Sequence, residues 1–385
     1  MLELETLLPS APDWEIPASV YDTVLGSLIY KLRQTPQEPA WHGEGDVLTH
    51  TRMVCEALAA MDAFRTADET TRQILFLAAL LHDIGKIPST RTEDGRWVSP
   101  GHTRIGAGMA RQILWQDFGL CGTPEKQQLR EAVCGLIRYH SLPPHAIDEP
   151  DGTLRLRRTA ANGTLAPGFT MQKLCILSEA DIRGRIFPDQ RALLEKVQLC
   201  RELAKEAGVL DAPYSFPSAY TAFSYLAGKN ISPDYPLYED TWGEVILMSG
   251  LPGTGKDTWI RENCPDIPMI SLDGIRKALG ISPRGNQEKV AAIAREQARE
   301  WLRKKQSFVW NATNITPTTR KKQIELFAGY GARVRLVYLE TDWEEQLRRN
   351  RERADTVPGN AICDMLEKLT PPERFEAHRV EWICV

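Results

Sequence analysis

Histidine and aspartate residues that could bind metal are concentrated in the first half of the 385-residue sequence, where six of the seven histidines precede residue 146. The segments LTHTRMV, LLHDIGK, GHTRIGAG, RYHSLPPH and SEADIRGR each place a histidine or an aspartate on an expected helix. His82 and Asp83 are adjacent, and such a pair is costly to bury without a partner. Mixed imidazole and carboxylate shells suit Mn²⁺, Fe²⁺, Co²⁺ or Ni²⁺. Two such ions can activate water and stabilise a phosphoryl displacement, so this half predicts metal-dependent phosphoester chemistry.

The cysteines do not provide a competing explanation for a metal site. Eight are scattered along the chain without a C-x-x-C pair, which argues against structural zinc and favours reduced thiols. Two histidines, His42 and His145, fall outside the pattern above, and we interpret them as loop or surface residues.

The second half carries different chemistry, in the segment SGLPGTGKDTW at residues 249–259. A phosphate-binding loop has the pattern G-x-x-x-x-G-K-[ST], follows a strand and opens a helix, so that backbone N–H groups face the phosphates. The sequence fits this pattern except at the hydroxyl position, which is Asp257. The expected nucleotide-binding residues are Gly250, Gly253, Thr254, Gly255, Lys256, Asp257 and Thr258.

Further polar residues follow the next expected strands. Asp273 stands at the carboxyl end of one, where ligands bind in open α/β sheets, and its carboxylate could accept a proton from an attacking hydroxyl. Alone, Asp273 could equally cap the following helix. Arg349 and Arg353 lie one helical turn apart and could cover a transferring phosphate, although such arginines often only form a solvated helix face.

The elements that must position these residues differ between the halves. Apolar periodicity is helical from residue 18 to 228, with 93–99 and 148–163 expected as turns or short hairpins, and residues 228–241 as a connector. Four short apolar runs then alternate with helices, which indicates a parallel sheet. The sequence therefore predicts an α-helical domain at 1–235 and an α/β domain with a central parallel sheet at 236–385. The expected strands are 244–250, 269–273, 307–313 and 333–340.

Composition excludes some classes of function. Net charge is −4, so nucleic acid could be bound only through a local basic surface. The N-terminal residues are acidic, unlike a signal peptide, and no apolar run reaches the ~18–20 residues that cross a bilayer. We expect a cytoplasmic protein that does not contact membranes.

Residues 243–385 resemble the P-loop 5′-hydroxyl polynucleotide kinases in three segments, GLPGTGKDTW, SLDGIR and RNRERADTVP. The resemblance implies transfer of the γ-phosphate of ATP or another NTP with Mg²⁺, Lys256 on the phosphates and Asp273 as general base. It also implies that Arg276 contacts the first phosphate of the acceptor and that Arg349 and Arg353 are lid arginines. The departure is Asp257, where that family has Ser, and we expect Asp257 to hold Mg²⁺ through water.

Residues 20–205 resemble the HD-domain phosphohydrolases through the series H…HD…H…H…D, and within them the HD domain of CCA-adding enzymes. The resemblance implies two divalent transition-metal ions, with Asp83 bridging them, and Lys86 and Arg185 holding the substrate phosphate. The implied ligands are His50, His82, Asp83 and Asp181 for one ion, with His102 and His140 added for the second.

The order of these two halves resembles the bacterial end-healing enzymes called HD-Pnk. That resemblance implies removal of a 2′,3′-cyclic or 2′-phosphate (and possibly a 3′-phosphate) from RNA or DNA ends, 5′-phosphorylation, and sealing by a separate ligase, because no K-x-D-G motif is present. Two alternatives remain. One is a small-molecule or nucleotide kinase fused to a nucleotide phosphohydrolase, and the other is a nucleotide-sensing regulatory protein.

Overall fold

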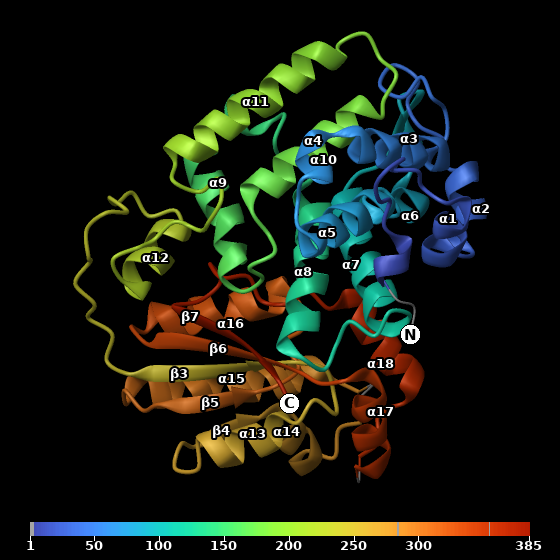
Figure 1. The fold of residues 1–385 in the computed structure, drawn as a ribbon. Helices are drawn as coiled ribbons and strands as arrows, with labels where there is room; N and C mark the ends of the chain where they lie inside the picture. The colour runs from blue at the N-terminus through green and yellow to red at the C-terminus, as the bar shows by residue number, and fades with distance from the viewer. Residues whose placement is uncertain (1–3, 283–284, 354) are drawn as a thin grey trace. The chain divides into compact units, whose positions relative to one another are not determined.

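The computed structural model describes residues 4–282, 285–353 and 355–385, which form two compact units (Figure 1). We call them the helical unit, which comprises residues up to Leu120 and Glu125–Tyr214, and the sheet unit, which comprises Cys121–Pro124 and Ser215–Val385. The division at residues 214 and 215 precedes the boundary expected at 235 and 236. Helix α12 (Ala219–Leu226) belongs to the sheet unit because its Phe223 ring packs on His378 at 3.9 Å between centroids.

The helical unit is built almost wholly from helices, as its apolar periodicity predicts. Among its described residues, β1 (Arg91–Glu93) and β2 (Arg96–Val98) form a two-stranded antiparallel hairpin, which confirms the turn expected at 93–99. In chain order its elements are η1 (Leu4–Leu7), α1 (Ala18–Leu25), α2 (Leu28–Gln34), α3 (Val47–Ala60), α4 (Asp62–Arg65), α5 (Glu69–Leu81), α6 (Lys86–Ser89), β1 (Arg91–Glu93), β2 (Arg96–Val98), α7 (His102–Gln116), α8 (Pro124–Tyr139), η2 (Ala146–Asp148), α9 (Gly152–Ala160), η3 (Ala161–Thr164), α10 (Met171–Arg183) and α11 (Gln190–Glu206).

Helices α3, α5 and α10 pack against one another at the centre of this unit. Every residue of α5 from Ile74 to Leu81 is buried, so this helix is enclosed on all sides. Helix α10 is buried almost continuously from Leu174 to Ile182. His50, His82, Asp83 and Asp181 lie on or next to these central helices, so the core holds them in fixed positions, whereas His102 begins α7 and His140 follows α8.

The expectation of turns or hairpins at residues 148–163 is wrong for most of that stretch, since α9 occupies Gly152–Ala160. The alternation of Leu and Arg in its sequence resembles a strand, but its buried residues are Gly152, Leu156, Thr159 and Ala160. That spacing of three and four residues places one helical stripe against the core.

The sheet unit contains five parallel strands in the order β4-β5-β3-β6-β7 (Figure 1). This arrangement confirms the α/β fold and its parallel sheet. The four expected strands are present, whereas β7 was not predicted: it lies at the sheet edge and buries only Val380, so its apolar signal is short. The remaining elements are β3 (Glu244–Ser249), α13 (Lys256–Asn263), β4 (Met269–Ser271), α14 (Leu272–Ala278), α15 (Gln287–Arg303), β5 (Phe308–Asn311), α16 (Pro317–Gly329), β6 (Arg333–Glu340), α17 (Trp343–Glu352), α18 (Gly359–Lys368) and β7 (Arg379–Cys384).

Helix α13, which follows the phosphate loop, is anchored on the sheet by its apolar face. Trp259 and Ile260 share a buried cluster with Ile246, Val309 and Leu339 from three strands. Strands β3, β5 and β6 are apolar on both faces because helices cover the sheet, as expected for a parallel arrangement. None of the helices among the described residues combines the length and the apolar character required to cross a bilayer.

Candidate functional site

In the helical unit, helix caps set the positions of the first histidines. Asp46 caps α3 by accepting a hydrogen bond from the Thr49 backbone N–H at 3.0 Å, and His50 follows on the first turn. His82 and Asp83 come directly after α5, whose buried length fixes them against α3. Helix packing therefore brings together residues that are 32 positions apart in the sequence.

Three of the implied ligands form a first cluster, which consists of His50, His82 and Asp181. His50 Nε2 lies 3.0 Å from Asp181 Oδ1 and 3.2 Å from His82 Nε2. All three side chains are almost completely buried. Two ring nitrogens and a carboxylate oxygen facing one point in this way form a ligand set suited to a divalent transition metal.

A second cluster, formed by Asp83, His102 and His140, adjoins the first. Asp83 Oδ2 lies 3.2 Å from His82 Nε2, while Oδ1 faces His102 Nε2 at 3.6 Å and His140 Nε2 at 4.0 Å. Asp83 thus has one oxygen toward each cluster. Its Oδ1 is buried and accepts no hydrogen bond, an arrangement that is costly for a carboxylate unless a cation occupies the space. The six residues therefore fit a pair of metal ions bridged by Asp83.

The imidazole tautomers also suit metal binding. In each ring Nδ1 lies against a backbone carbonyl oxygen, which can only accept, so Nδ1 carries a proton and the Nε2 lone pair of the neutral ring faces the cluster. The pairs are His50 with Gly184 at 3.2 Å, His82 with Ala79 at 2.8 Å, His102 with Ser99 at 2.8 Å, and His140 with Ile137 at 2.8 Å.

Electrostatics keep both aspartates and His140 in the ionisation states that metals require. Burial opposes ionisation of Asp83, but Lys86, His82 and His102 together outweigh it and hold the pKa of Asp83 well below its usual value. Arg185 and His50 likewise outweigh burial and hold the pKa of Asp181 well below its usual value. Burial lowers the pKa of His140 to about 3, so this ring is neutral at physiological pH. Ionised carboxylates beside a neutral imidazole can accept a cation without first losing protons.

Two cations border the clusters, as the resemblance implied. Lys86 Nζ lies 2.7 Å from Asp83 Oδ2, and Arg185 Nε lies 3.1 Å from Asp181 Oδ1. Both also line a cavity of about 260 Å³ together with His102 and His140. A phosphate in this cavity would meet both cations and the metal-ligating residues.

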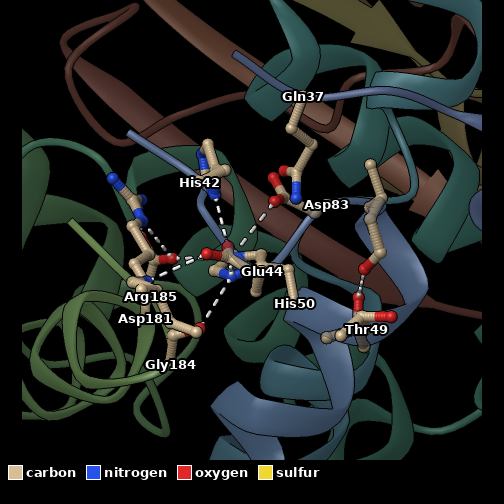
Figure 2. A network of polar contacts seen from close by, with 12 residues as sticks. Gln37, His42, Glu44, Thr49, His50, Asp83, Asp181, Gly184 and Arg185 are labelled. Carbon is tan, nitrogen blue, oxygen red and sulfur yellow. Dashed lines mark hydrogen bonds and ion pairs between the residues drawn. The ribbon is translucent and has the colours of Figure 1, made fainter. Parts of the chain in front are cut away.

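The sequence did not reveal the residues behind His50. Glu44 accepts hydrogen bonds from His50 Nδ1 at 3.0 Å and from His42 Nδ1 at 2.7 Å (Figure 2). Its second oxygen accepts a hydrogen bond from the Ile186 backbone N–H at 2.9 Å. His42 lies in a loop, as expected, but its side chain is buried beside the cluster and is not a surface group. The only indication of these residues in the sequence was the segment WHGEGD. It places a histidine and an acidic residue next to glycines just before a capped helix. His145 is exposed and belongs to neither cluster.

In the sheet unit, the phosphate loop takes a shape that only glycine allows at two positions. Gly250 has φ +143°, and a Cβ there would lie 2.6 Å from the Leu339 carbonyl oxygen. Gly253 has φ +86°, and a Cβ there would lie 2.8 Å from the Gln346 carbonyl oxygen. Gln346 also donates to the Pro252 carbonyl oxygen at 3.0 Å, so α17 supports the loop directly.

Lys256 opens α13 and lies across the loop. Its Nζ donates to the carbonyl oxygens of Gly250 and Leu251, both at 2.8 Å. Burial lowers the pKa of Lys256 to about 8, with the positive charge of Arg353 acting in the same direction and the charge of Asp257 opposing it. A triphosphate would provide the charge partner that this buried ammonium lacks.

The two residues after Lys256 face outward. Asp257 is exposed, and its Oδ1 accepts a hydrogen bond from Asn311 Nδ2 at 2.6 Å, at the end of β5. Thr258 is also exposed and accepts a hydrogen bond from Arg261 at 3.2 Å, whereas Thr254 is buried and donates to the Leu251 carbonyl oxygen at 2.9 Å. Thr254 therefore fixes the loop, while Asp257 is the accessible acid at its edge.

The expected catalytic residues occupy the surroundings of the loop. Asp273 and Arg276 form an ion pair on the first turns of α14, and Arg276 also donates to Gln287 Oε1 at 3.0 Å. Arg349 pairs with Glu345 at 2.7 Å, and a Cβ at Gly255 would lie 3.4 Å from its guanidinium. The structure thus brings Arg349 to the loop, while Asp273 and Arg353 are close enough to influence the pKa of Lys256.

Comparison with known proteins identifies one domain family in each half. Residues 47–164 match the HD domain, a range that includes five of the six implied ligands but not Asp181, and residues 245–372 match the AAA domain. The chain is 27% identical over 151 residues to the mouse (Mus musculus) heterogeneous nuclear ribonucleoprotein U-like protein 2, covering 34% of this chain and 20% of the relative. It is 41% identical over 78 residues to the multifunctional CCA protein of Halorhodospira halophila, covering 20% of this chain and 16% of the relative.

A third relative is the L-seryl-tRNA(Sec) kinase of Methanococcus maripaludis, which is 24% identical over 135 residues that cover 33% of this chain and 53% of the relative. The chain thus spans between 16% and 53% of the length of these relatives. What the matches support together is an HD domain fused to a P-loop, kinase-like domain in one chain.

Proposed function

We propose that this protein heals broken nucleic-acid ends. The helical unit removes a 2′-phosphate, or opens and removes a 2′,3′-cyclic phosphate, at one end. The sheet unit transfers the γ-phosphate of ATP or another NTP to a 5′-hydroxyl end. A separate ligase then joins the ends.

The observation that carries the proposal is the meeting of the six implied ligands in two adjoining clusters, with Lys86, Arg185 and two of those ligands, His102 and His140, lining one cavity. Metal ions held by the two clusters would supply a nucleophilic hydroxide and neutralise charge on the phosphoryl oxygens. Lys86 and Arg185 would bind the non-bridging phosphate oxygens, since each is already oriented by an aspartate. Neutral His140 holds its Nε2 toward Asp83 and keeps the second ligand set in place.

The sheet unit supports phosphoryl transfer to a hydroxyl group. The loop and Lys256 would bind the triphosphate, and Asp273 would take the proton of the attacking hydroxyl once substrate displaces its contact with Arg276. Arg276, released from Asp273, would then bind a phosphate of the acceptor strand. The S-x-D-x-x-R spacing and this ion pair favour an acceptor that carries both a hydroxyl and a phosphate, as a polynucleotide end does.

The names of the three relatives favour RNA as the substrate class. They describe a ribonucleoprotein, a CCA protein and a kinase of seryl-tRNA(Sec). The last of these names a kinase whose acceptor is attached to RNA. In addition, a 2′-phosphate can occur only at an RNA end, because DNA lacks the 2′-hydroxyl group.

The test uses the full chain with Mg²⁺ or Mn²⁺, ATP and an RNA oligonucleotide that carries a 5′-hydroxyl and a 2′-phosphate. Both ends are scored after incubation. We expect loss of the 2′-phosphate and gain of a 5′-phosphate. Asp273→Ala should abolish only the phosphorylation of the 5′-hydroxyl. The double variant His82→Ala/Asp83→Ala should abolish only the removal of the 2′-phosphate.

Two results would contradict the proposal. If the oligonucleotide remained unchanged while free nucleosides or sugars were phosphorylated, the alternative of a small-molecule kinase would be favoured. If nucleotide bound but neither end changed under any of the metals, the protein would be a nucleotide sensor instead.

A further inference from the structure

The cavity above the metal clusters has an aromatic rim that phosphate chemistry does not explain. Trp41 and Trp97 both line it, together with Lys86 and Arg185. All ten tryptophans lie in described residues, and only these two are exposed, Trp41 by 50% and Trp97 by 41%. Exposed tryptophans at the opening of a charged cavity are typical of a ligand site.

Both tryptophans are held in position by contacts to segments that adjoin the metal site. Trp97 lies on β2, its backbone N–H donates to Glu38 Oε2 at 3.0 Å, and the hairpin leads through Ser99 directly to His102. Trp41 packs against Phe187 at 6.1 Å between ring centroids. The segments that carry Trp41 and Phe187 are joined by a hydrogen bond of 2.9 Å, which the Gly43 backbone N–H donates to the Ile186 carbonyl oxygen.

The charges around the cavity divide it into two ends. Lys86 and Arg185 lie beside the metal-ligating aspartates and attract a phosphate there. Glu38, which accepts from the Trp97 amide, adds a negative charge near the tryptophans. That charge disfavours a second phosphate at the aromatic end and favours a neutral, flat group. The cavity has a volume of about 260 Å³, slightly below the ~300–1,000 Å³ typical of ligand pockets. A cavity of this size suits a single nucleotide.

We propose that Trp41 and Trp97 form a nucleobase subsite of the helical unit. They stack on the base of the same nucleotide whose ribose phosphate meets the metal-ligating residues. Because every base has a π-face, stacking of this kind binds any terminal nucleotide and does not select a sequence. This inference rests on the proposed phosphoesterase activity and adds to it that the substrate must carry a base next to the phosphate.

The experiment compares two RNA oligonucleotides that bear a 2′-phosphate on the last sugar, one with an ordinary base there and one abasic. Wild-type protein should cleave the base-bearing substrate with a kcat/KM about 5- to 100-fold higher, the range expected from the loss of one stacked base. Trp41→Ala and Trp97→Ala should each reduce that advantage and leave the abasic substrate unaffected, while Trp97→Phe should retain most of it. Tyr30→Ala, at an exposed aromatic residue of α2 that does not line the cavity, is the matched control.

A binding measurement separates this inference from the proposed function. Adenosine and ribose are titrated against wild type and the double variant Trp41→Ala/Trp97→Ala by isothermal titration calorimetry. Binding of adenosine but not of ribose, lost in the double variant, supports the subsite even if neither oligonucleotide is cleaved. Equal kcat/KM for base-bearing and abasic substrates, or an equal loss on both in the variants, overturns the subsite while cleavage itself still supports the proposed function.

Discussion

The two candidate sites are organised in opposite ways. In the helical unit the side chains of His50, His82 and Asp83 are at most 2% exposed, and each is oriented by the protein itself. In the sheet unit the side chain of Asp273 is 64% exposed, and Lys256 contacts backbone carbonyls in place of a phosphate. The helical site is therefore preorganised for metal. The phosphate loop of the sheet unit also has a fixed shape, but the side chains around it would reach their working positions only when substrate binds.

The largest effect should come from removing the carboxylate shared by the two clusters. Asp83→Asn keeps the shape but removes the negative charge between both ligand sets, so we expect phosphate release to fall by ~10³-fold, the factor that corresponds to several kcal/mol of metal stabilisation. Kinase activity should not change, because Asp83 lies in the other unit. Measuring metal content by mass spectrometry alongside both activities tests this, and a parallel loss of kinase activity would contradict two independent sites.

In the sheet unit, the backbone conformation of the phosphate loop should matter as much for nucleotide binding as the charge of Asp83 matters for metal binding in the helical unit. Gly250→Ala places a Cβ 2.6 Å from the Leu339 carbonyl at φ +143°, so we expect nucleotide binding to be lost and the free energy of unfolding to fall by ~1–3 kcal/mol. Gly329→Ala is the matched control, because Gly329 ends α16 with nothing within 4 Å of the added Cβ. ATP titration and urea denaturation measure both effects. Normal ATP affinity in Gly250→Ala would mean that the loop is not preformed.

A smaller effect is expected behind the metal ligands. Glu44→Gln removes the charge that His50 Nδ1 faces while retaining an oxygen, so metal affinity should fall by ~10–100-fold, as for other outer partners of ligating histidines. Exposed Glu69 provides the control as Glu69→Gln. Chelator competition gives the affinity directly. Unchanged affinity would show that helix packing, and not Glu44, orients His50.

The sequence was most informative where local pattern and long-range packing agree. Periodicity predicted the helical and parallel α/β units. Four of the six implied ligands meet because α3, α5 and α10 form one buried core, and His102 at the start of α7 and His140 after α8 join them. It was least informative where contacts join distant segments. Glu44 lies in a loop without periodicity, and its role depends on residues 142 positions away, such as Ile186. The edge strand β7 and the helix α9 were missed because each buries few residues.

The smallest effect tests whether substrate completes the sheet unit's site. Burial lowers the pKa of Lys256 to about 8 from its ordinary 10.5, so the folded protein binds fewer protons than the unfolded chain between these values, and its stability should rise with pH across that window. A triphosphate should raise the pKa again, so nucleotide binding should take up a fraction of a proton at pH 8–10 and none at pH 6. Calorimetry in two buffers of different ionisation enthalpy measures the uptake, and Lys256→Met should abolish it. Uptake that persisted in this variant would assign the proton to another group and leave Lys256 already charged before nucleotide arrives.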